Sequence, residues 1–271
     1  MRWRIFALVA FLCLAACGDD DSDFATRPDG KESSSSAAPK SSDGKTKNDG
    51  SEYDADANTL TDFRDGQIYK TVSIGDQVWM AENLNYAYTD VPFEISGNTD
   101  DSTSWCYDND PVNCSKYGRL YTWAAAMDSV GTWSANSKGC GYLKTCSPSN
   151  PVRGVCPKDW HLPSNDEWNT LVNAVGDSIT AGKVLKSTSG WNNYNGKGGN
   201  GTDAFGFSAF STGYRVASGS YSTEGDYANV WSSTEDDDEG AYNMHLYYHN
   251  DDVDLDNNPK YNGFSVRCVK D

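Results

Sequence analysis

The side chains that could carry out catalysis are few in this 271-residue sequence. Its three histidines, His161, His245 and His249, supply the imidazole groups that could act as general bases. No G-x-S-x-G segment or comparable nucleophile turn accompanies them. A pair of hydrolytic carboxylates stays open, because acidic residues are abundant and their separation in space is invisible in a sequence. We therefore expect a protein that is not an enzyme, with a carboxylate-based hydrolase as the alternative.

The segment DDVDLDNNPK, residues 251–260, carries hard oxygen atoms of the kind that calcium binds. These atoms belong to Asp254, Asp256 and Asn258 in alternation. The EF-hand pattern fails, because Pro259 replaces the required glycine and Ser265 stands where the bidentate glutamate should be. We therefore expect an exposed acidic loop and no cofactor, with calcium left open by an incomplete motif.

Rings that could bind a ligand gather in AYNMHLYYHN, residues 241–250. By the two-residue period of a strand, one face would carry Met244, Leu246 and Tyr248, and the other His245, Tyr247 and His249. The first is the natural core side, so the second would expose flat, hydrogen-bonding rings that suit sugar faces and protein hot spots alike. A polar outer face without a partner is the alternative. A metal site is disfavoured, because the H-x-x-x-H spacing suits a helix.

A glycine-rich connection, residues 191–206, is the second candidate binding segment. It is not a phosphate loop, since no GK[ST] ending follows. Long connections of this kind carry ligand contacts on rigid scaffolds, and its large side chains, Trp191 and Tyr194, would either bind a ligand or cover the core. The predicted ligand-binding residues are therefore Tyr242, His245, Tyr247, His249, Trp191 and Tyr194.

The charge of the chain limits its partners. The formal net charge is −17, which repels phosphate backbones and excludes nucleic acid as an expected partner. Aromatic residues make up 13% of the chain, and an acidic, ring-rich surface suits neutral ligands. We expect a glycan or a protein as the partner, met at the cell surface.

The clearest element that could position these groups is a helix over residues 164–175. Ser164 and Glu167 form the S-x-x-E capping box at its start, and the apolar stripe that follows consists of Trp168, Leu171, Val172 and Val175. Upstream, Gly75 and Asp76 separate two alternating apolar runs, which predicts a hairpin. The segment GRLYTWAAAM, residues 118–127, predicts a further short helix with one apolar face.

Downstream of the capped helix, short β segments alternate with glycine and asparagine clusters. The predicted strands lie around residues 205–209, 227–234, 241–250 and 263–271. Helices come early and strands late, which favours an α+β fold with a mainly antiparallel sheet over a doubly wound fold. Trp160 and Trp168 are expected in the core, and His161 beside them is expected to be a structural hydrogen-bonding residue.

Eight cysteines indicate an oxidising compartment. Cys13 and Cys17 precede the folded part, so an even number, six, remain within it. Spacing favours bridges between Cys106 and Cys114, Cys140 and Cys146, and Cys156 and Cys268, although six cysteines allow fifteen pairings. Zinc is the competing interpretation, but no C-x-x-C pair is present.

The N-terminal residues predict export. Arg2 and Arg4 precede an apolar run that ends in LAAC at Cys17, which resembles a bacterial lipobox. Residues 1–17 are then a signal peptide and Cys17 is lipidated, with an ordinary signal peptide or a short anchor as alternatives. The run is too short to span a bilayer comfortably. Contact with the membrane is therefore expected only through the N-terminal lipid.

The next segment is expected to be a tether. Residues 18–61 are rich in Ser and Asp and contain few large apolar side chains, which predicts disorder, and residues 62–271 form one domain. The stretch GDDDSD after Cys17 resembles the signal that sends some lipoproteins of Bacteroidetes-like bacteria to the outer face of the outer membrane. Surface exposure is the expectation, with the periplasmic face as the alternative.

Several blocks of the folded region resemble, in order, the major paralogous domain family named after Fibrobacter succinogenes. They are TVSIGDQVWMAENLNY, GRLYTWAAAM, CPKDWHLPSNDEW, GTDAFGFSAFSTGYR, YANVWSSTE and NGFSVRCVKD. The resemblance implies a C-type-lectin-like fold, in which two helices flank an antiparallel sheet with paired N- and C-terminal strands. Trp160 and Trp168 would then wedge the second helix against the sheet.

The resemblance leaves both enzymatic and calcium-dependent activity unsupported. Formylglycine-generating enzymes share the lectin-like fold and use reactive cysteines with copper, but the six cysteines here have a disulfide explanation. The Glu-Pro-Asn loop and the Trp-Asn-Asp strand of calcium-binding lectins are absent, with WSSTE at the corresponding strand. We therefore expect a surface-anchored binding module for polysaccharide or protein ligands.

Overall fold

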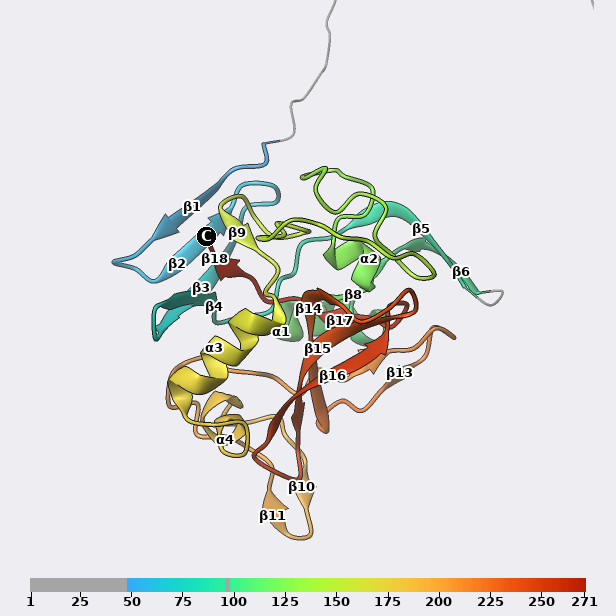
Figure 1. The fold of residues 1–271 in the computed structure, drawn as a ribbon. Helices are drawn as coiled ribbons and strands as arrows, with labels where there is room; N and C mark the ends of the chain where they lie inside the picture. Colours follow the sequence, from blue (N-terminus) through green and yellow to red (C-terminus); the bar gives the residue numbers. More distant parts are fainter. Residues whose placement is uncertain (1–47, 96–97) are drawn as a thin grey trace, which may run out of the picture. The chain divides into compact units, whose positions relative to one another are not determined.

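The computed structural model describes residues 48–95 and 98–271 (Figure 1). The folded unit spans Thr46–Asp271. The predicted signal peptide, the lipidation site Cys17 and most of the predicted tether lie outside the described residues.

The folded unit starts earlier than the predicted boundary at residue 62. Strand β1 (Ser51–Asp54) pairs with β2 (Thr59–Asp62), which in turn pairs with β3 (Gln67–Ile74). Leu60 is fully buried, and the ring of Tyr53 packs edge-on against Trp160. The sequence pattern does not predict these two strands. Each four-residue strand carries only one large apolar side chain, so it shows no apolar periodicity that would distinguish residues 51–61 from the tether.

The first six-stranded sheet has the order β1-β2-β3-β4-β18-β9. The predicted hairpin is confirmed, since β3 and β4 (Gln77–Met80) are antiparallel and Gly75 has the positive φ of a tight turn. The last strand, β18 (Val269–Lys270), lies between β4 and β9 (Trp160–His161). The C-terminal strand therefore pairs with the early hairpin strand β4 and not with β1.

The second six-stranded sheet has the order β16-β15-β14-β17-β8-β7. Its strands are β7 (Ser104–Trp105), β8 (Leu120–Tyr121), β14 (Tyr227–Glu235), β15 (Gly240–Tyr247), β16 (Val253–Pro259) and β17 (Phe264–Ser265). Among the described strands, β14 and β17 form the one parallel pairing. The expected acidic loop at 251–260 is instead largely strand β16, because Val253 and Leu255 pack inward next to β15.

Two predicted β segments differ from the observed strands. The strand expected over 241–250 ends at Tyr247, so His249 lies beyond it. The segment around Phe207 and Ala209 forms only an isolated bridge, from Ala209 to Lys186, although both apolar side chains are buried. The segment over 263–271 divides into β17 and β18, which belong to different sheets.

The helices are short, and α3 (Asn165–Val175) is the longest among the described residues. The others are α1 (Pro111–Tyr117), α2 (Trp123–Ala126), α4 (Ala181–Leu185) and the 3₁₀ helix η1 (Tyr107–Asn109). The helix predicted over 118–127 shrinks to α2. Its first residues instead pair as β8 with β17 and β7, so tertiary pairing overrides the local helical stripe.

Three small hairpins complete the described part of the fold. They are β5 (Thr89–Ile95) with β6 (Asn98–Ser102), β10 (Asn193–Tyr194) with β11 (Lys197–Gly198), and β12 (Tyr214–Arg215) with β13 (Tyr221–Ser222). Figure 1 shows that the β10–β11 hairpin projects beside the ends of the late strands β15 and β16. This hairpin belongs to the glycine-rich connection.

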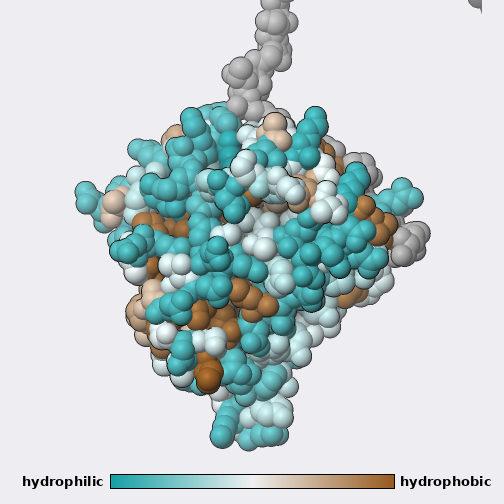
Figure 2. Space-filling view, viewed as in Figure 1, coloured by the Kyte–Doolittle hydropathy of each residue, from teal (hydrophilic) through white to brown (hydrophobic). Residues whose placement is uncertain are grey.

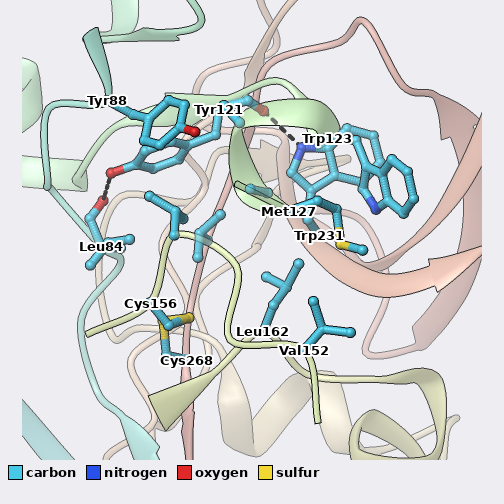
Figure 3. Packing of buried hydrophobic residues seen from close by; sticks show 14 of the residues in the cluster. Leu84, Tyr88, Tyr121, Trp123, Met127, Val152, Cys156, Leu162, Trp231 and Cys268 are labelled. Carbon is cyan, nitrogen blue, oxygen red and sulfur yellow. Dashed lines mark hydrogen bonds between the residues drawn. A yellow bond between two sulfur atoms is a disulfide. The ribbon is translucent and has the colours of Figure 1, made fainter. Parts of the chain in front are cut away.

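Tryptophans occupy the centre of the core. Trp168 of α3 stacks on Trp79 of β4, with ring centroids 4.7 Å apart, and both are fully buried. On the other side, the indole N–H of Trp231 donates to the carbonyl of Tyr121 at 2.7 Å, in the cluster shown in Figure 3. Trp160 is buried as well. Both tryptophans that bracket the capped helix start are therefore core residues, as predicted.

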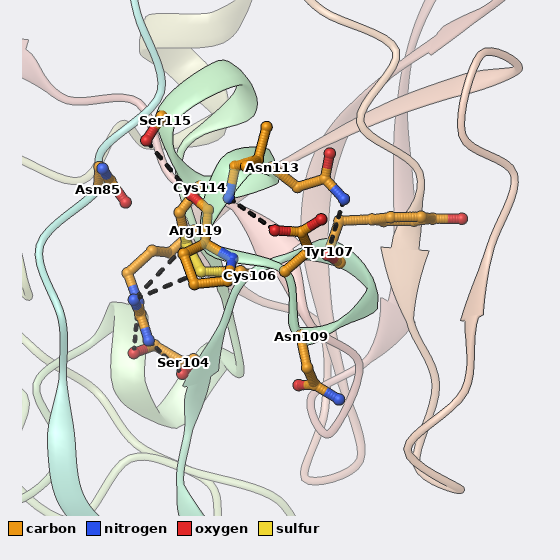
Figure 4. Close-up of a disulfide and its surroundings, with 12 residues drawn as sticks. Asn85, Ser104, Cys106, Tyr107, Asn109, Asn113, Cys114, Ser115 and Arg119 are labelled. Carbon is orange, nitrogen blue, oxygen red and sulfur yellow. Dashed lines mark hydrogen bonds between the residues drawn. A yellow bond between two sulfur atoms is a disulfide. The ribbon is translucent and has the colours of Figure 1, made fainter.

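The three expected disulfides are present. They join Cys106 to Cys114, Cys140 to Cys146, and Cys156 to Cys268. The last bridge is fully buried between the helix entry and the segment before β18 (Figure 3). Beside the first, Arg119 lies 3.5 Å from Cys114 Sγ and donates to the Ser104 carbonyl (Figure 4).

The architecture is mostly β, with a curled antiparallel sheet and few short helices, which is compatible with the predicted α+β class. Helix α3 packs against both sheets, on β3 of the first and on β14 and β15 of the second. The face shown in Figure 2 is largely hydrophilic, with apolar residues gathered over the α3–α4 region. No helix in the described part of the chain has the length and apolar character that crossing a bilayer requires.

Candidate ligand-binding site

The outer face of β15 carries the rings that the period of the strand predicts. The His245 and Tyr247 rings are stacked with centroids 4.0 Å apart, and Tyr247 lies 5.2 Å from His249. Tyr227, on the neighbouring strand β14, packs edge-on against both His245 and Tyr247. Met244 and Leu246 point into the core and are fully buried. The assigned inner and outer faces of this part of the strand are therefore correct.

The β10–β11 hairpin adds a ring from a distant part of the sequence. Tyr194 lies 5.5 Å from His249 and 5.6 Å from Tyr248, measured between ring centroids. Its side chain is 44% exposed. We call the continuous set of Tyr194, Tyr227, His245, Tyr247 and His249 the ring ladder.

A carboxylate of β16 fixes the middle of the ring ladder. Asp256 Oδ2 accepts a hydrogen bond from the Tyr247 hydroxyl at 3.2 Å and lies 3.0 Å from His245 Nδ1. Burial lowers the pKa of His245 and outweighs the opposing effect of Asp256, so the ring is neutral at pH 7. Burial and the nearby carboxylates Asp256 and Asp254 raise the pKa of Tyr247. The middle of the ladder therefore presents two neutral rings, His245 and Tyr247, whose orientation is fixed.

A hollow of about 370 Å³ opens at the exposed end of the ring ladder. Its lining consists of Lys183, Lys186, Tyr194, Lys197, Gly198, Tyr248, His249, Asn250 and Asp251. These residues come from α4, the β10–β11 hairpin and the turn after β15. The hollow thus joins three segments that are far apart in the sequence, with rings and ammonium groups in one lining.

Comparison with known protein families identifies the family of the chain. The family model of the Fibrobacter succinogenes major domain matches residues 72–270, which is more than half of the chain. The chain belongs to this family. The match contains β14, β15, β16 and both hairpin strands that carry the site. Neither the curated proteins nor the solved structures that were compared with the chain gave a significant match.

Two predicted site residues of this Fibrobacter major domain lie away from the hollow surface. Trp191 is only 5% exposed, and its indole N–H donates to the Ala209 carbonyl at 3.1 Å. It covers the core, so its assignment to the ligand surface is wrong. Tyr242, at the other end of β15, is paired with Asn257 of β16, and hydrogen bonding to Asp236 raises its pKa.

The oxygen-rich segment ends at a buried lysine, Lys260, whose partners lie in the turn after β14 and at Lys144. The Lys260 ammonium group is buried and donates to the Asp237 carbonyl at 2.7 Å and to the Lys144 carbonyl at 3.0 Å, beside the Glu235 carboxylate. Lys260 therefore places one positive charge beside the Glu235 carboxylate at the start of this acidic turn. Across the described ranges, no group of three or more His, Cys, Asp or Glu side chains is arranged to hold a metal ion.

His161 is a structural hydrogen-bonding residue in this chain, as expected. Its two ring nitrogens each lie 2.6 Å from a carboxylate oxygen, one of Glu167 and one of Asp271. Burial lowers the pKa of His161, but the hydrogen bonds and charges of the two carboxylates outweigh it, and the pKa is raised. The side chain is buried and lines neither the hollow of about 370 Å³ nor the one of about 530 Å³.

Sequence reasoning missed the lysines and Tyr248. Lys183 belongs to α4, whose contribution to the site depends on a long-range contact with the 250–252 turn, where Gly182 N–H donates to the Asp251 carbonyl. Tyr248, predicted on the core face, does pack against the core cluster, but it lies just beyond the end of the strand and also lines the hollow. Of these residues, Lys197 is the one that the sequence could have indicated, because it is the lone cation of the glycine-rich connection.

Proposed function

We propose that this protein is a surface-anchored, non-catalytic binding module that binds polysaccharide along the ring ladder. The observation that carries the proposal is the continuity of the ladder with the hollow, through the shared residues Tyr194 and His249. Flat rings stack on the apolar faces of sugars, while neighbouring amides and carboxylates hydrogen-bond to sugar hydroxyls. A hollow of about 370 Å³ is within the usual range for small-molecule sites.

Preorganisation supports a binding role for the ring ladder. His245 and Tyr247 are stacked on each other, held by Asp256 and packed against Tyr227, so a ligand would immobilise little additional side-chain freedom. Fixed rings of this kind provide contact area at a low cost in conformational entropy. A protein ligand would use the same rings, and polysaccharide is preferred because the ladder continues into a hollow of the size of a small-molecule site.

The proposal also includes the fold type and the cellular location of the protein. The position of β18 next to β4, together with α3 packed on both sheets, supports a C-type-lectin-like arrangement. The lipobox-like ending at Cys17 and the acidic residues after it support a lipid anchor on the outer face of the outer membrane, with the domain facing outward. A module held at the surface in this way would retain polymers near the cell.

Binding and turnover assays on the same full chain test the proposal. We expect retention on insoluble cellulose or xylan without release of reducing sugar. The double variant Tyr247→Ala/His249→Ala should lose at least about tenfold in affinity, because it removes one ring from the middle of the ladder and one that lines the hollow. Its melting temperature should stay close to that of the wild type, since neither ring belongs to the core clusters.

A matched control comes from a second ring pair. Tyr142 and Tyr261 contact each other edge-on at 5.0 Å and line a different hollow, of about 530 Å³. The double variant Tyr142→Ala/Tyr261→Ala should bind like the wild type. Unchanged affinity in the ladder variant would contradict the proposed site, and steady release of reducing sugar would favour the hydrolase alternative.

A further inference from the structure

Positive charge gathers at one place in this acidic protein. The chain carries a formal net charge of −17. The hollow at the end of the ring ladder nevertheless collects three lysines, Lys183, Lys186 and Lys197, against a single carboxylate, Asp251. A lining of that composition does not follow from the average charge of the surface. It favours a ligand that brings negative charge of its own.

Lys186 supplies charge that its surroundings compensate only in part. The side chain is 1% exposed, and its ammonium group donates to the carbonyls of Tyr247 and Asn250 at 3.0 and 2.7 Å. Its carboxylate partner, Asp251, is 3.6 Å away and 50% exposed. Burial therefore lowers the pKa of Lys186 despite Asp251. An anion in the hollow would stabilise this buried cation further.

The other two lysines can reach a ligand directly. Lys183 Nζ donates to the Asn200 carbonyl at 3.1 Å, which holds the ammonium group at the edge of the hollow and leaves further donors for a ligand. Lys197 lies on the exposed strand β11, directly opposite Tyr194 in the antiparallel pairing of the hairpin. The hollow therefore combines directed ammonium donors with the rings of Tyr194, Tyr248 and His249.

We propose that the hollow recognises the carboxylate of a uronic acid, so that the ligand is an acidic polysaccharide such as a polyuronate. This inference rests on the proposed function and specifies its ligand class. A uronic acid has an apolar ring face for stacking and a carboxylate at its edge, which matches rings and ammonium groups that share one lining. A neutral sugar would occupy the rings and leave the ammonium groups without an anion.

The negative charge of the remaining surface does not prevent this recognition. At physiological ionic strength the screening length is about 8 Å, so carboxylates far from the hollow act weakly on a bound ligand. The lysines of the lining act at contact distance and are screened much less. Affinity for a uronate should therefore depend on these few lysines more than on the net charge.

The test compares two polymers that have the same sugar backbone and differ in the methyl ester that removes the charge. Polygalacturonate and its fully methyl-esterified, neutral form are titrated against the full chain at 150 mM NaCl. We expect at least tenfold tighter binding of the acidic polymer. Lys197→Gln and Lys183→Gln, which alter lysines outside the core clusters, should each reduce that preference severalfold. Lys116→Gln is the control, since Lys116 is exposed beside Glu224 and outside the hollow.

The outcomes separate this inference from the proposed function. Equal affinity for the acidic and the esterified polymer, lost for both in Tyr247→Ala/His249→Ala, would overturn uronate recognition and leave polysaccharide binding intact. A preference for the acid that persists in Lys183→Gln and Lys197→Gln would overturn the assignment to this hollow. Failure of the wild-type chain to bind any of the acidic and neutral polysaccharides would overturn both proposals.

Discussion

At the scale of single residues, buried cations hold the loops of this protein together by collecting backbone carbonyl oxygens. Lys260 joins the turn after β14 to Lys144, and Lys186 joins α4 to the turn after β15. Arg267 donates to the Ser208 carbonyl and to Asn83 Oδ1, and Arg64 to the Val155 carbonyl. Each buried charge is satisfied by several oxygens, as burial of an ion requires. These contacts fix long connections that contain little regular structure.

His161 leads to a prediction about pH. Its raised pKa means that its stabilising effect is complete below the ordinary histidine value of 6.5 and is lost as pH rises through the raised value. For Glu167, burial raises the pKa, but hydrogen bonds from His161 and Ser164 outweigh it, so the net pKa is lowered. The effect of Glu167 is present above 4.5 and is lost as pH falls. We call the contact between His161 and Glu167 the charged clamp, and it should stabilise the fold most between these two pH values.

We therefore expect His161→Gln to lower the free energy of unfolding by about 2 kcal/mol near pH 5.5, and by less at pH 8. Urea unfolding at several pH values measures the difference between the variant and the wild type. Ser218→Ala, a change at an exposed serine that carries no titratable group, should show little dependence on pH in the same comparison. A His161→Gln penalty that grows from pH 5.5 to pH 8 would contradict the charged clamp.

At the scale of elements, the start of α3 shows how local chemistry is reused for tertiary contacts. Ser164 Oγ accepts from the Glu167 N–H, and the Glu167 carboxylate accepts from the Ser164 N–H, which completes the capping box. The same carboxylate contacts His161 of β9. The helix start is thus attached to the sheet that contains the C-terminal strand.

Removal of the cap should cost a modest amount of stability. Ser164→Ala is expected to lower the free energy of unfolding by about 1 kcal/mol, because the Glu167 N–H loses its acceptor. For a domain of this size that corresponds to a decrease of roughly 2–4 °C in Tm, which differential scanning calorimetry can measure. Ser218→Ala, in the turn between β12 and β13, is the control and should leave Tm unchanged. An unaltered Tm in Ser164→Ala would show that the cap is dispensable.

At the scale of the whole molecule, the disulfides differ in what they connect. Cys140–Cys146 and Cys106–Cys114 each close a local loop, with sequence separations of 6 and 8. Cys156–Cys268 has a separation of 112 and joins the segment before β9 to the segment before β18, within the same sheet. It therefore encloses α3, α4, both late hairpins and the strands of the ring ladder.

Loss of the long-range Cys156–Cys268 bridge should lower the free energy of unfolding more than loss of a local bridge does. In the chain-entropy model, Cys156→Ala/Cys268→Ala lowers the free energy of unfolding by about 4–5 kcal/mol, and Cys140→Ala/Cys146→Ala by about 2 kcal/mol. Denaturant unfolding of the two double variants measures the contrast, and non-reducing peptide mapping confirms the pairing in each. Equal losses in both variants would rule out loop closure as the cause.

The sequence alone determined the features that depend on neighbouring residues. The capping box at Ser164, the hairpin turn at Gly75 and the inward side of Met244 and Leu246 follow from local spacing, because backbone geometry sets those periods. The disulfide pairing was also predicted, since two short spacings left one remaining pair. Most of the ring ladder was therefore predictable from one strand.

Only the tertiary structure decided which distant segments complete the site. Trp191 and Tyr194 are three residues apart in one connection, yet the core takes the first ring and the hollow takes the second. Lys183 and Lys197 reach the same hollow from a helix and a hairpin, and residues 51–61 join a sheet instead of the tether. Such choices depend on which apolar surfaces are buried against each other, and that energy is summed over long-range contacts that no local pattern contains.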